Sequence, residues 1–294
     1  MHRRWNTIVL GGFLALSAGG VNAQARKWEA LYAFGDSYTD SGAGYVDGNG
    51  PTAVVYLASR LKIPFTYAGD PHSSGKSLNF AVSGAQTGSS EGIRIRPAIA
   101  KCGSDETLFN RGMQNQVADF AQRVKSGAIR FDPQKTLFFV AGGLNDHTVP
   151  TATSIANLEG EVRTLYASGG RYFLVALLPK KIPPFSDVGM RLDPELAKIP
   201  GEIRSSLSGI HIELSRWGEY FDGVLDNPVA YGIKNTKDQC AGRKIFGEDP
   251  TACAAPDSYF YFHEGHPSTA VQRIVAQEME RELTKAFPLK KGAP

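Results

Sequence analysis

A serine on a glycine-led turn is the first residue of this chain that is suited to chemistry. Ser37 lies in segment 34–42 (FGDSYTDSG), directly after an apolar stretch. A serine hydroxyl is a weak nucleophile at its own pKa, so it needs a neighbouring base and donors for the negative charge that its attack creates. If Ser37 is a nucleophile, other segments must supply both.

Three later segments offer such groups. Asn145 follows the apolar run at 137–141 and a pair of glycines, so it lies on a tight turn after a buried strand. His266 lies on a loop just before a helical pattern, and Gly84 lies in segment 79–85 (NFAVSGA). Because glycine has no side chain, its backbone N–H can approach a ligand closely. The chain therefore offers an imidazole, a side-chain amide and an accessible N–H.

In this order the four segments resemble the GDSL lipase/esterase family, also called SGNH hydrolases. The letters S, G, N and H correspond to Ser37, Gly84, Asn145 and His266, and the resemblance runs from about Leu31 to the C-terminal helix. It implies that Ser37 attacks an ester carbonyl while His266 takes up the proton and later returns it. It also implies an oxyanion site made of the N–H groups of Ser37 and Gly84 and the Asn145 amide, with no cofactor or metal.

One position departs from the family pattern. The family carries Asp three residues before the histidine, where it orients the imidazole, but this chain has His263 there. Three replacements are open: the Glu264 carboxylate, the main-chain carbonyl of His263, or a remote acid such as Asp257. We favour a Ser–His dyad in which a carbonyl accepts the Nδ1 proton. The missing Asp also motivates an alternative, a carbohydrate- or lipid-binding relative that has lost turnover.

Each residue also has a purely structural interpretation. Ser37 is of a type that caps helices, Gly84 is suited to a turn, and Asn145 can begin an Asx turn. His266 precedes Pro267 at the start of a helix. Four such coincidences in the family's order are improbable together, so the hydrolase interpretation is favoured.

A metal site at the two C-terminal histidines is not expected. His263 and His266 lie three residues apart in a loop with Glu264 between them. The metalloprotease motif instead places two histidines four apart on one helical face. No cysteine or carboxylate cluster nearby in the sequence would complete a zinc site.

The first 25 residues have the features of a signal peptide. Arg3 and Arg4 give a positive start, 8–16 is a short apolar run, and small residues allow cleavage after Ala23 or Ala25. The apolar run is too short to span a bilayer. We therefore expect an exported protein, periplasmic or extracellular, with no integral membrane segment after cleavage.

Export makes disulfides possible, and the chain has three cysteines. Cys240 and Cys253 flank a loop rich in Gly, Asp and Pro just before the His266 segment, so we expect them to pair. A bridge there would stiffen the loop that delivers the base. Cys102 is then left as a free thiol.

Composition limits the remaining possibilities. The chain has 294 residues, of which 42% are hydrophobic, and a formal charge of +3, which gives no indication of nucleic acid binding. Motifs spread over the whole length favour a single SGNH domain at 26–294, and we expect the protein to be a monomer. Substrates are expected to be small-molecule, glycan or lipid esters. No long amphipathic lid is evident, so we favour short acyl or acetyl esters, with a lipase or lysophospholipase as the alternative.

Strand and helix patterns alternate along the chain. Continuous apolar runs, typical of a parallel sheet covered on both faces, predict strands at 29–34, 137–140 and 172–178. Helical spacing predicts helices at 53–61, 115–126, 155–167, 204–225 and 269–287. Two regions, 91–111 and 180–200, are expected to be irregular and to wall the substrate site. The expected fold is α/β: a three-layer α/β/α sandwich with a central, mainly parallel sheet, the flavodoxin-like SGNH hydrolase fold.

Overall fold

Six parallel strands form the central sheet, in the order β2-β3-β1-β6-β7-β8. The computed structural model describes residues 26–73, 75–95 and 107–289. In chain order the strands of this sheet are β1 (Ala30–Gly35), β2 (Thr66–Tyr67), β3 (Leu78–Asn79), β6 (Thr136–Ala141), β7 (Tyr172–Ala176) and β8 (His211–Ser215). The strands predicted at 29–34, 137–140 and 172–178 are confirmed as β1, β6 and β7.

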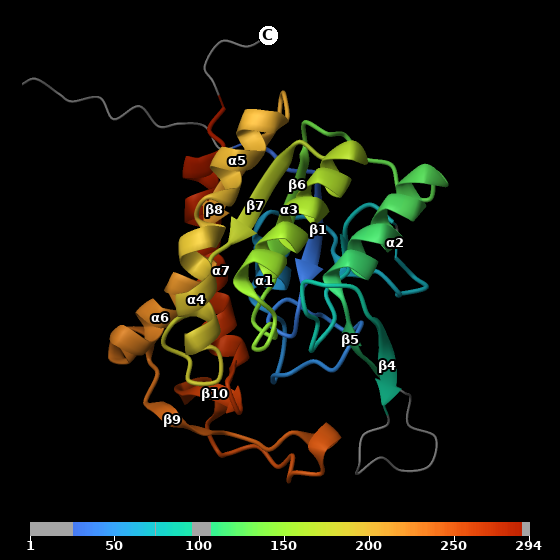
Figure 1. Ribbon diagram of the computed structural model, residues 1–294. Helices are drawn as coiled ribbons and strands as arrows, with labels where there is room; N and C mark the ends of the chain where they lie inside the picture. The colour runs from blue at the N-terminus through green and yellow to red at the C-terminus, as the bar shows by residue number, and fades with distance from the viewer. Residues whose placement is uncertain (1–25, 74, 96–106, 290–294) are drawn as a thin grey trace, which may run out of the picture.

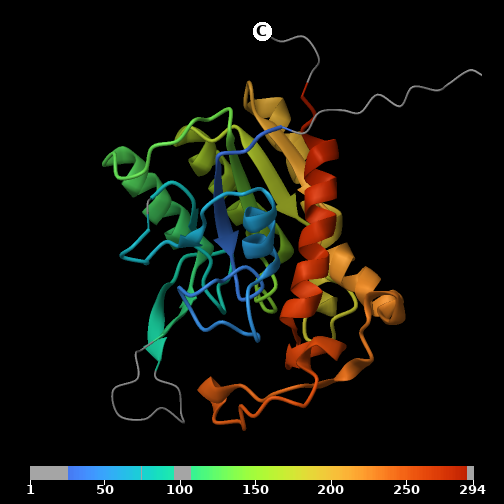
Figure 2. The same cartoon turned by 180° about the vertical axis from the view of Figure 1, so that it is seen from behind.

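Helices cover both faces of this sheet. The layer in front of the sheet in Figure 1 contains α2 (Met113–Lys125), α3 (Thr151–Ala167), α4 (Ser186–Leu196) and α5 (Ile199–Ser206). Seen from behind, in Figure 2, the other layer contains α1 (Ala53–Arg60), α6 (Trp217–Asp226) and α7 (Thr269–Ala286). The expected three-layer α/β/α sandwich is confirmed.

Burial on both faces explains the continuous apolar runs. Every residue of β1, β6 and β7 is buried, because helices cover each side of the sheet. Aromatic side chains fill much of the interior: Phe34 stacks on Phe80, and Phe138 stacks on Phe173. These strands are therefore fixed on both sides, and so are the residues that directly follow them.

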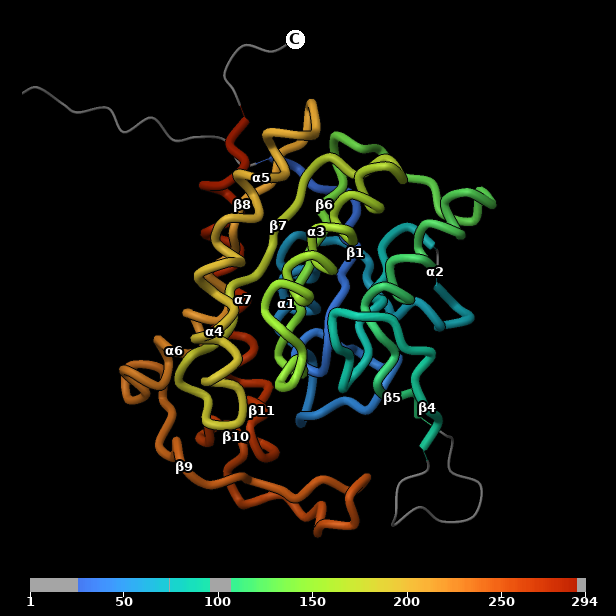
Figure 3. Tube along the Cα trace, in the orientation of Figure 1, coloured from blue at the N-terminus to red at the C-terminus, as the bar shows by residue number. Residues whose placement is uncertain are grey.

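Two small sheets lie beyond the carboxyl ends of the central strands (Figure 3). One is a hairpin of β4 (Glu91–Ile95) and β5 (Thr107–Arg111). The other contains β9 (Asn235–Gln239), β10 (Tyr259–His263) and β11 (His266–Pro267), in the order β11-β10-β9. Three short 3₁₀ helices accompany the second sheet: η1 (Pro228–Tyr231), η2 (Lys244–Phe246) and η3 (Pro256–Ser258).

The single helix predicted at 204–225 is wrong. The chain there forms the end of α5, the strand β8 and then α6. α5 ends at Ser206, and Gly209 in the following turn has a φ of +69°, which a continuing helix could not contain. The following residues pair in parallel with β7, with Ile212 and Ser215 buried. The exposed edge of β7 thus gains a strand that the helical pattern did not predict.

The two regions expected to be irregular contain regular structure. Region 91–111 supplies β4 and β5, and region 180–200 supplies α4 and the start of α5. In α4, Val188, Leu192 and Leu196 are buried at a spacing of one helical turn, although Pro194 lies inside the helix. Burial of this apolar stripe outweighs the local cost of Pro194, which has no N–H to donate to the carbonyl of Met190.

The other predicted helices are confirmed with shifted ends, as α1, α2, α3 and α7. The predicted signal peptide and Cys102 lie outside the described residues. Among the residues that are described, no helix has both the length and the apolar character needed to cross a membrane.

Candidate active site

Ser37 lies on the turn that directly follows β1. The carbonyl of Asp36 accepts hydrogen bonds from the N–H groups of Thr39 and Asp40, and the Asp36 carboxylate accepts one from the N–H of Tyr38 at 3.1 Å. These bonds fold the chain back immediately after the strand. The Ser37 side chain is consequently presented at the carboxyl edge of the sheet.

Asp36 itself is fully buried. Burial, together with a smaller effect of the nearby Asp146 carboxylate, raises the pKa of its carboxyl group to about 7, although hydrogen bonds from backbone N–H groups oppose the shift. One of its oxygens has no hydrogen-bond partner within the described structure. The neutral form of this carboxyl group therefore predominates below about pH 7.

His266 reaches Ser37 from the opposite end of the sequence. Its Nε2 lies 2.8 Å from Ser37 Oγ, and its Nδ1 lies 2.8 Å from the main-chain carbonyl oxygen of Glu264. A carbonyl can only accept, so Nδ1 carries the proton and Nε2 is left to accept the serine proton. The turn before His266 is held by the Tyr38 hydroxyl, which donates to the Gly265 carbonyl.

The surroundings of His266 favour the neutral ring. Burial lowers the pKa of the imidazole below its usual value. The charge of Asp47 and the hydrogen bond to Glu264 oppose this effect, whereas Arg243 and His263 reinforce it. A neutral imidazole beside the hydroxyl is the state that a general base requires.

The group that orients His266 is a main-chain carbonyl, but it belongs to Glu264 and not to His263. The Glu264 carboxylate points elsewhere and forms an ion pair with Arg243 at 3.2 Å, with 67% of its side chain exposed. Asp257 is exposed to solvent on η3. Neither the Glu264 carboxylate nor Asp257 therefore contacts Nδ1 of His266.

Asp47 is a site residue that the sequence reasoning missed. One carboxylate oxygen lies 2.9 Å from Nδ1 of His263, and the other lies 3.5 Å from Nε2 of His266. In sequence it is part of a turn-forming stretch, Asp47-Gly48-Asn49-Gly50, which signals a loop and no more. A contact over a sequence separation of 216 residues has no local signal.

Gly84 and Asn145 line the same cavity as Ser37. Gly84 has a φ of +78°, and a Cβ added to it would lie 1.9 Å from the Asn110 side-chain oxygen, so both conformation and space require glycine. The Asn145 amide nitrogen donates to the Ala85 carbonyl at 2.9 Å. One of its two hydrogens is therefore committed, which fixes the amide plane and leaves the second hydrogen for a ligand.

These residues line one cavity of about 240 Å³. Ser37, Gly84, Asn145 and His266 all contribute to it. Its other walls combine apolar and charged side chains, namely Phe109, Pro184, Phe185, Asp47, Arg243 and Glu264. Four segments far apart in the sequence thus converge on a single site, which can hold a small carbonyl compound against a hydroxyl, an imidazole and N–H donors.

A disulfide joins Cys240 and Cys253. The same two residues also share a backbone hydrogen bond, from the N–H of Cys253 to the carbonyl of Cys240 at 2.8 Å. The bridge closes the loop between β9 and β10, and β10 pairs with β11, which carries His266. Only the strand β10 therefore separates the end of β9, where the disulfide begins, from the strand that carries His266.

The described part of the chain contains no group of three or more His, Cys, Asp or Glu side chains arranged to hold a metal ion. His263 and His266 both face Asp47, and His266 also contacts Ser37. These contacts explain why the two rings lie close together without a metal ion between them.

Comparison with known proteins gives a family match over most of the chain. The family model described as GDSL-like Lipase/Acylhydrolase matches residues 31–279. No curated relative matches the chain in sequence. Among solved structures, a member of the lipolytic G-D-S-L family from Veillonella parvula is similar, with 13% identity, a TM-score of 0.47 and coverage of 85% of this chain and 95% of that one.

Two esterases are also among the similar structures. A catalytic mutant of an acetylxylan esterase from Geobacillus stearothermophilus has 13% identity, a TM-score of 0.46 and coverage of 89% of this chain and 96% of that one. The aryl esterase of M. smegmatis has 12% identity, a TM-score of 0.41 and coverage of 88% and 100%.

Proposed function

Since the chain belongs to the GDSL-like lipase/acylhydrolase family, it is a serine hydrolase of carboxylic esters, and we propose that Ser37 is its nucleophile and His266 its general base and acid. The observation that carries the proposal is the 2.8 Å contact between Ser37 Oγ and His266 Nε2. It joins residues 229 positions apart in sequence at the edge where ligands of open parallel sheets bind.

The first half of the reaction forms an acyl-serine. Ser37 Oγ attacks the ester carbonyl carbon while its proton moves to His266 Nε2, and the carbonyl electron pair becomes an oxyanion. The oxyanion accepts hydrogen bonds from the N–H groups of Ser37 and Gly84 and from the free Asn145 amide hydrogen. The tetrahedral intermediate collapses, the ester C–O bond breaks, and Nε2 returns its proton to the leaving alcohol.

The second half reverses these roles with water. A water molecule gives a proton to Nε2 as its oxygen attacks the acyl carbon, and the same three donors hold the new oxyanion. Collapse breaks the bond to Ser37 Oγ, which recovers the proton from Nε2. The products are the carboxylic acid and the free enzyme.

We propose short acyl groups, acetyl included, as the preferred substrates. The cavity of about 240 Å³ around Ser37 is smaller than the roughly 300–1,000 Å³ typical of pockets for drug-sized ligands. The aromatic rings of Phe109 and Phe185 and the ring of Pro184 are among its walls. A long acyl chain would need room beyond this cavity, and we assign the larger cavity beside it to the alcohol, so the lipase alternative is disfavoured.

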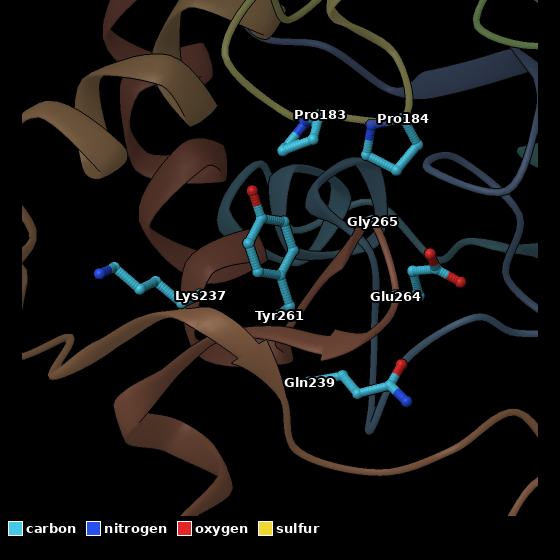
Figure 4. A pocket seen from close by; sticks show the side chains of 7 residues that line it. All are labelled: Pro183, Pro184, Lys237, Gln239, Tyr261, Glu264 and Gly265. Atoms are coloured by element: carbon cyan, nitrogen blue, oxygen red, sulfur yellow. The ribbon is translucent and has the colours of Figure 1, made fainter.

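A second cavity of about 470 Å³ shares Pro184 and Glu264 with the first and borders the turn before His266 (Figure 4). We propose that it receives the leaving alcohol, because the histidine must reach the leaving oxygen to protonate it. The Tyr261 ring stands at its centre, between Lys237 and Glu264. Such a mixture of a ring and polar groups suits a polar alcohol such as a sugar.

We also propose that the protein is exported, with a signal peptide cleaved after Ala23 or Ala25 and the remainder acting as one domain and as a monomer. The Cys240–Cys253 disulfide supports an oxidising compartment. The mass of the protein recovered from periplasm or medium would test this. An uncleaved N-terminus would contradict it.

Hydrolysis of p-nitrophenyl esters from acetate to palmitate tests the catalytic proposal. We expect kcat/KM to be highest for the shortest chains and to vanish in Ser37→Ala. A maximum at long chains would favour the lipase or lysophospholipase alternative. An absence of turnover on every ester, together with binding of a glycan or lipid, would favour the binding-protein alternative.

A further inference from the structure

We propose that Asp47 is a positioning residue for His266, which supplies from a remote loop the carboxylate that position 263 lacks, and that His263 holds this carboxylate in place. The inference rests on the proposed function, because it concerns the imidazole that serves Ser37. It assigns a role both to the unexpected histidine and to an acid far away in sequence.

One carboxylate faces both histidine rings. Oδ1 of Asp47 lies 2.9 Å from Nδ1 of His263, and Oδ2 lies 3.5 Å from Nε2 of His266. The Asp47 side chain is only 5% exposed, and the two rings are 6% and 7% exposed. Charges that are buried together are weakly screened by solvent, so this carboxylate acts strongly on both rings.

Contacts that do not involve His266 fix the loop that carries Asp47. The Asn49 side-chain oxygen accepts a hydrogen bond from the N–H of Thr269 at 2.7 Å, and the Pro51 carbonyl accepts one from the Thr269 hydroxyl at 3.1 Å. The Tyr45 ring stacks on His263 with centroids 6.0 Å apart. The carboxylate is therefore held beside the start of α7, three residues after His266.

The arrangement compensates for a weak partner at Nδ1. When Nε2 takes the serine proton, the ring becomes a cation, and the Glu264 carbonyl at Nδ1 carries only a partial negative charge. Within the described residues, Asp47 is the only acid whose carboxylate lies within 4.0 Å of a ring nitrogen of His266. Its charge stabilises the imidazolium that forms in the transition state.

The distance to Nε2 is also suited to this role. An N–H···O hydrogen bond spans about 2.7–3.2 Å, so a carboxylate oxygen at 3.5 Å does not capture the proton in this arrangement. The proton on Nε2 remains available to the leaving oxygen. Asp47 thus differs from an acid at Nδ1, because it stabilises the imidazolium from the side of Nε2, the nitrogen that exchanges the proton.

The other groups facing His266 define what the carboxylate must balance. Burial, Arg243 and His263 lower the pKa of the imidazole, and Asp47 and the Glu264 hydrogen bond raise it. The Glu264 carboxylate is paired with Arg243, and the Tyr38 hydroxyl donates to the Gly265 carbonyl. Without the Asp47 charge, only the hydrogen bond to the Glu264 carbonyl would oppose the groups that lower the pKa of His266.

The test is the pH dependence of kcat/KM on p-nitrophenyl acetate for wild type and Asp47→Asn. We expect the acid limb of Asp47→Asn to move down by about one pH unit or more and kcat at pH 8 to fall by about tenfold or more, because one unit equals a tenfold change. Asp193→Asn, which removes a buried carboxylate bonded to the N–H of Leu178, is the control and should leave the limb in place.

An unmoved acid limb in folded Asp47→Asn would overturn the proposal, even if kcat fell. If the variant does not fold, the ¹³C carboxyl resonance of Asp47 in wild type makes the same test: it should follow the titration of the His266 ring, and independence of the two would overturn the proposal. Failure of the proposed function is recognised separately: the Ser37→Ala variant would then hydrolyse the ester as fast as wild type. The resonance test does not depend on turnover.

Discussion

The two halves of the site are supported by different parts of the molecule. Ser37 and Asn145 follow β1 and β6, which are neighbouring, fully buried strands of the central sheet. His266 lies on the two-residue strand β11 at the edge of a separate three-stranded sheet. The nucleophile and an oxyanion donor therefore rest on the central sheet, and the base rests on a small outer layer, the sheet of β9, β10 and β11.

The outer layer is tied to the core side by a few specific contacts. Tyr38 bonds to the turn before His266, the 47–51 loop bonds to Thr269, and the Cys240–Cys253 bridge closes the neighbouring loop. β11 is only two residues long, so it depends on such links to keep its position. We infer that substitutions of Ser37 or Asn145, the core half of the site, remove a reacting or hydrogen-bonding group. Substitutions around His266, the outer half, lower the rate by displacing the imidazole.

The strongest test of the comparison asks whether the two halves act as one unit. Ser37→Ala and His266→Ala should each lower kcat by about 10⁴-fold or more, and the double variant should lose no more than the worse single variant, since neither residue works without the other. Steady-state rates on p-nitrophenyl acetate measure this. Losses that multiply in the double variant would mean that the two residues act independently.

Asn145→Ala tests the core half alone. We expect kcat to fall by about 10²- to 10³-fold with little change in KM, because one donor to the oxyanion is lost. The melting temperature should stay close to that of wild type. Gln86→Ala is the matched control, since this exposed amide bonds to the Asn145 carbonyl outside the cavity. A comparable loss in the control would show that backbone position, not the donor, is being measured.

Removal of the disulfide tests the outer half. Cys240→Ser with Cys253→Ser should lower the free energy of unfolding by about 2–4 kcal/mol, because the unfolded chain gains freedom. Urea unfolding measures the change. Wild type treated with dithiothreitol should approach the variant, and the variant should not respond to it. Equal free energies of unfolding for wild type and variant would show that the disulfide does not stabilise the fold.

Asp36→Asn tests the buried turn beneath Ser37. The folded pKa of Asp36, about 7, exceeds the ordinary value of 3.8, so wild-type stability is lost as pH rises through this interval. The variant lacks this loss. Its stability relative to wild type should therefore increase by about 2 kcal/mol between pH 5.5 and pH 7.5, measured by urea unfolding. A difference independent of pH would show that Asp36 is ionised in the fold.

The same contrast explains what could be predicted from the sequence. Buried apolar runs and glycine turns are local signals, so β1, β6 and the positions of Ser37 and Asn145 could be predicted. The strand β8 could not, because five residues of mixed polarity between two helices carry no signal until they pair with β7. Asp47 could not either, because a contact across 216 residues depends on how the outer layer folds back.

The central claim is that Ser37 is the activated nucleophile and His266 the group that activates it. Labelling with a fluorophosphonate, followed by peptide mapping, measures this directly. We predict one adduct, on Ser37, in wild type, none in Ser37→Ala, and strongly slowed labelling in His266→Ala. An adduct on another residue, or labelling of Ser37 at an unchanged rate without the imidazole, would contradict the account.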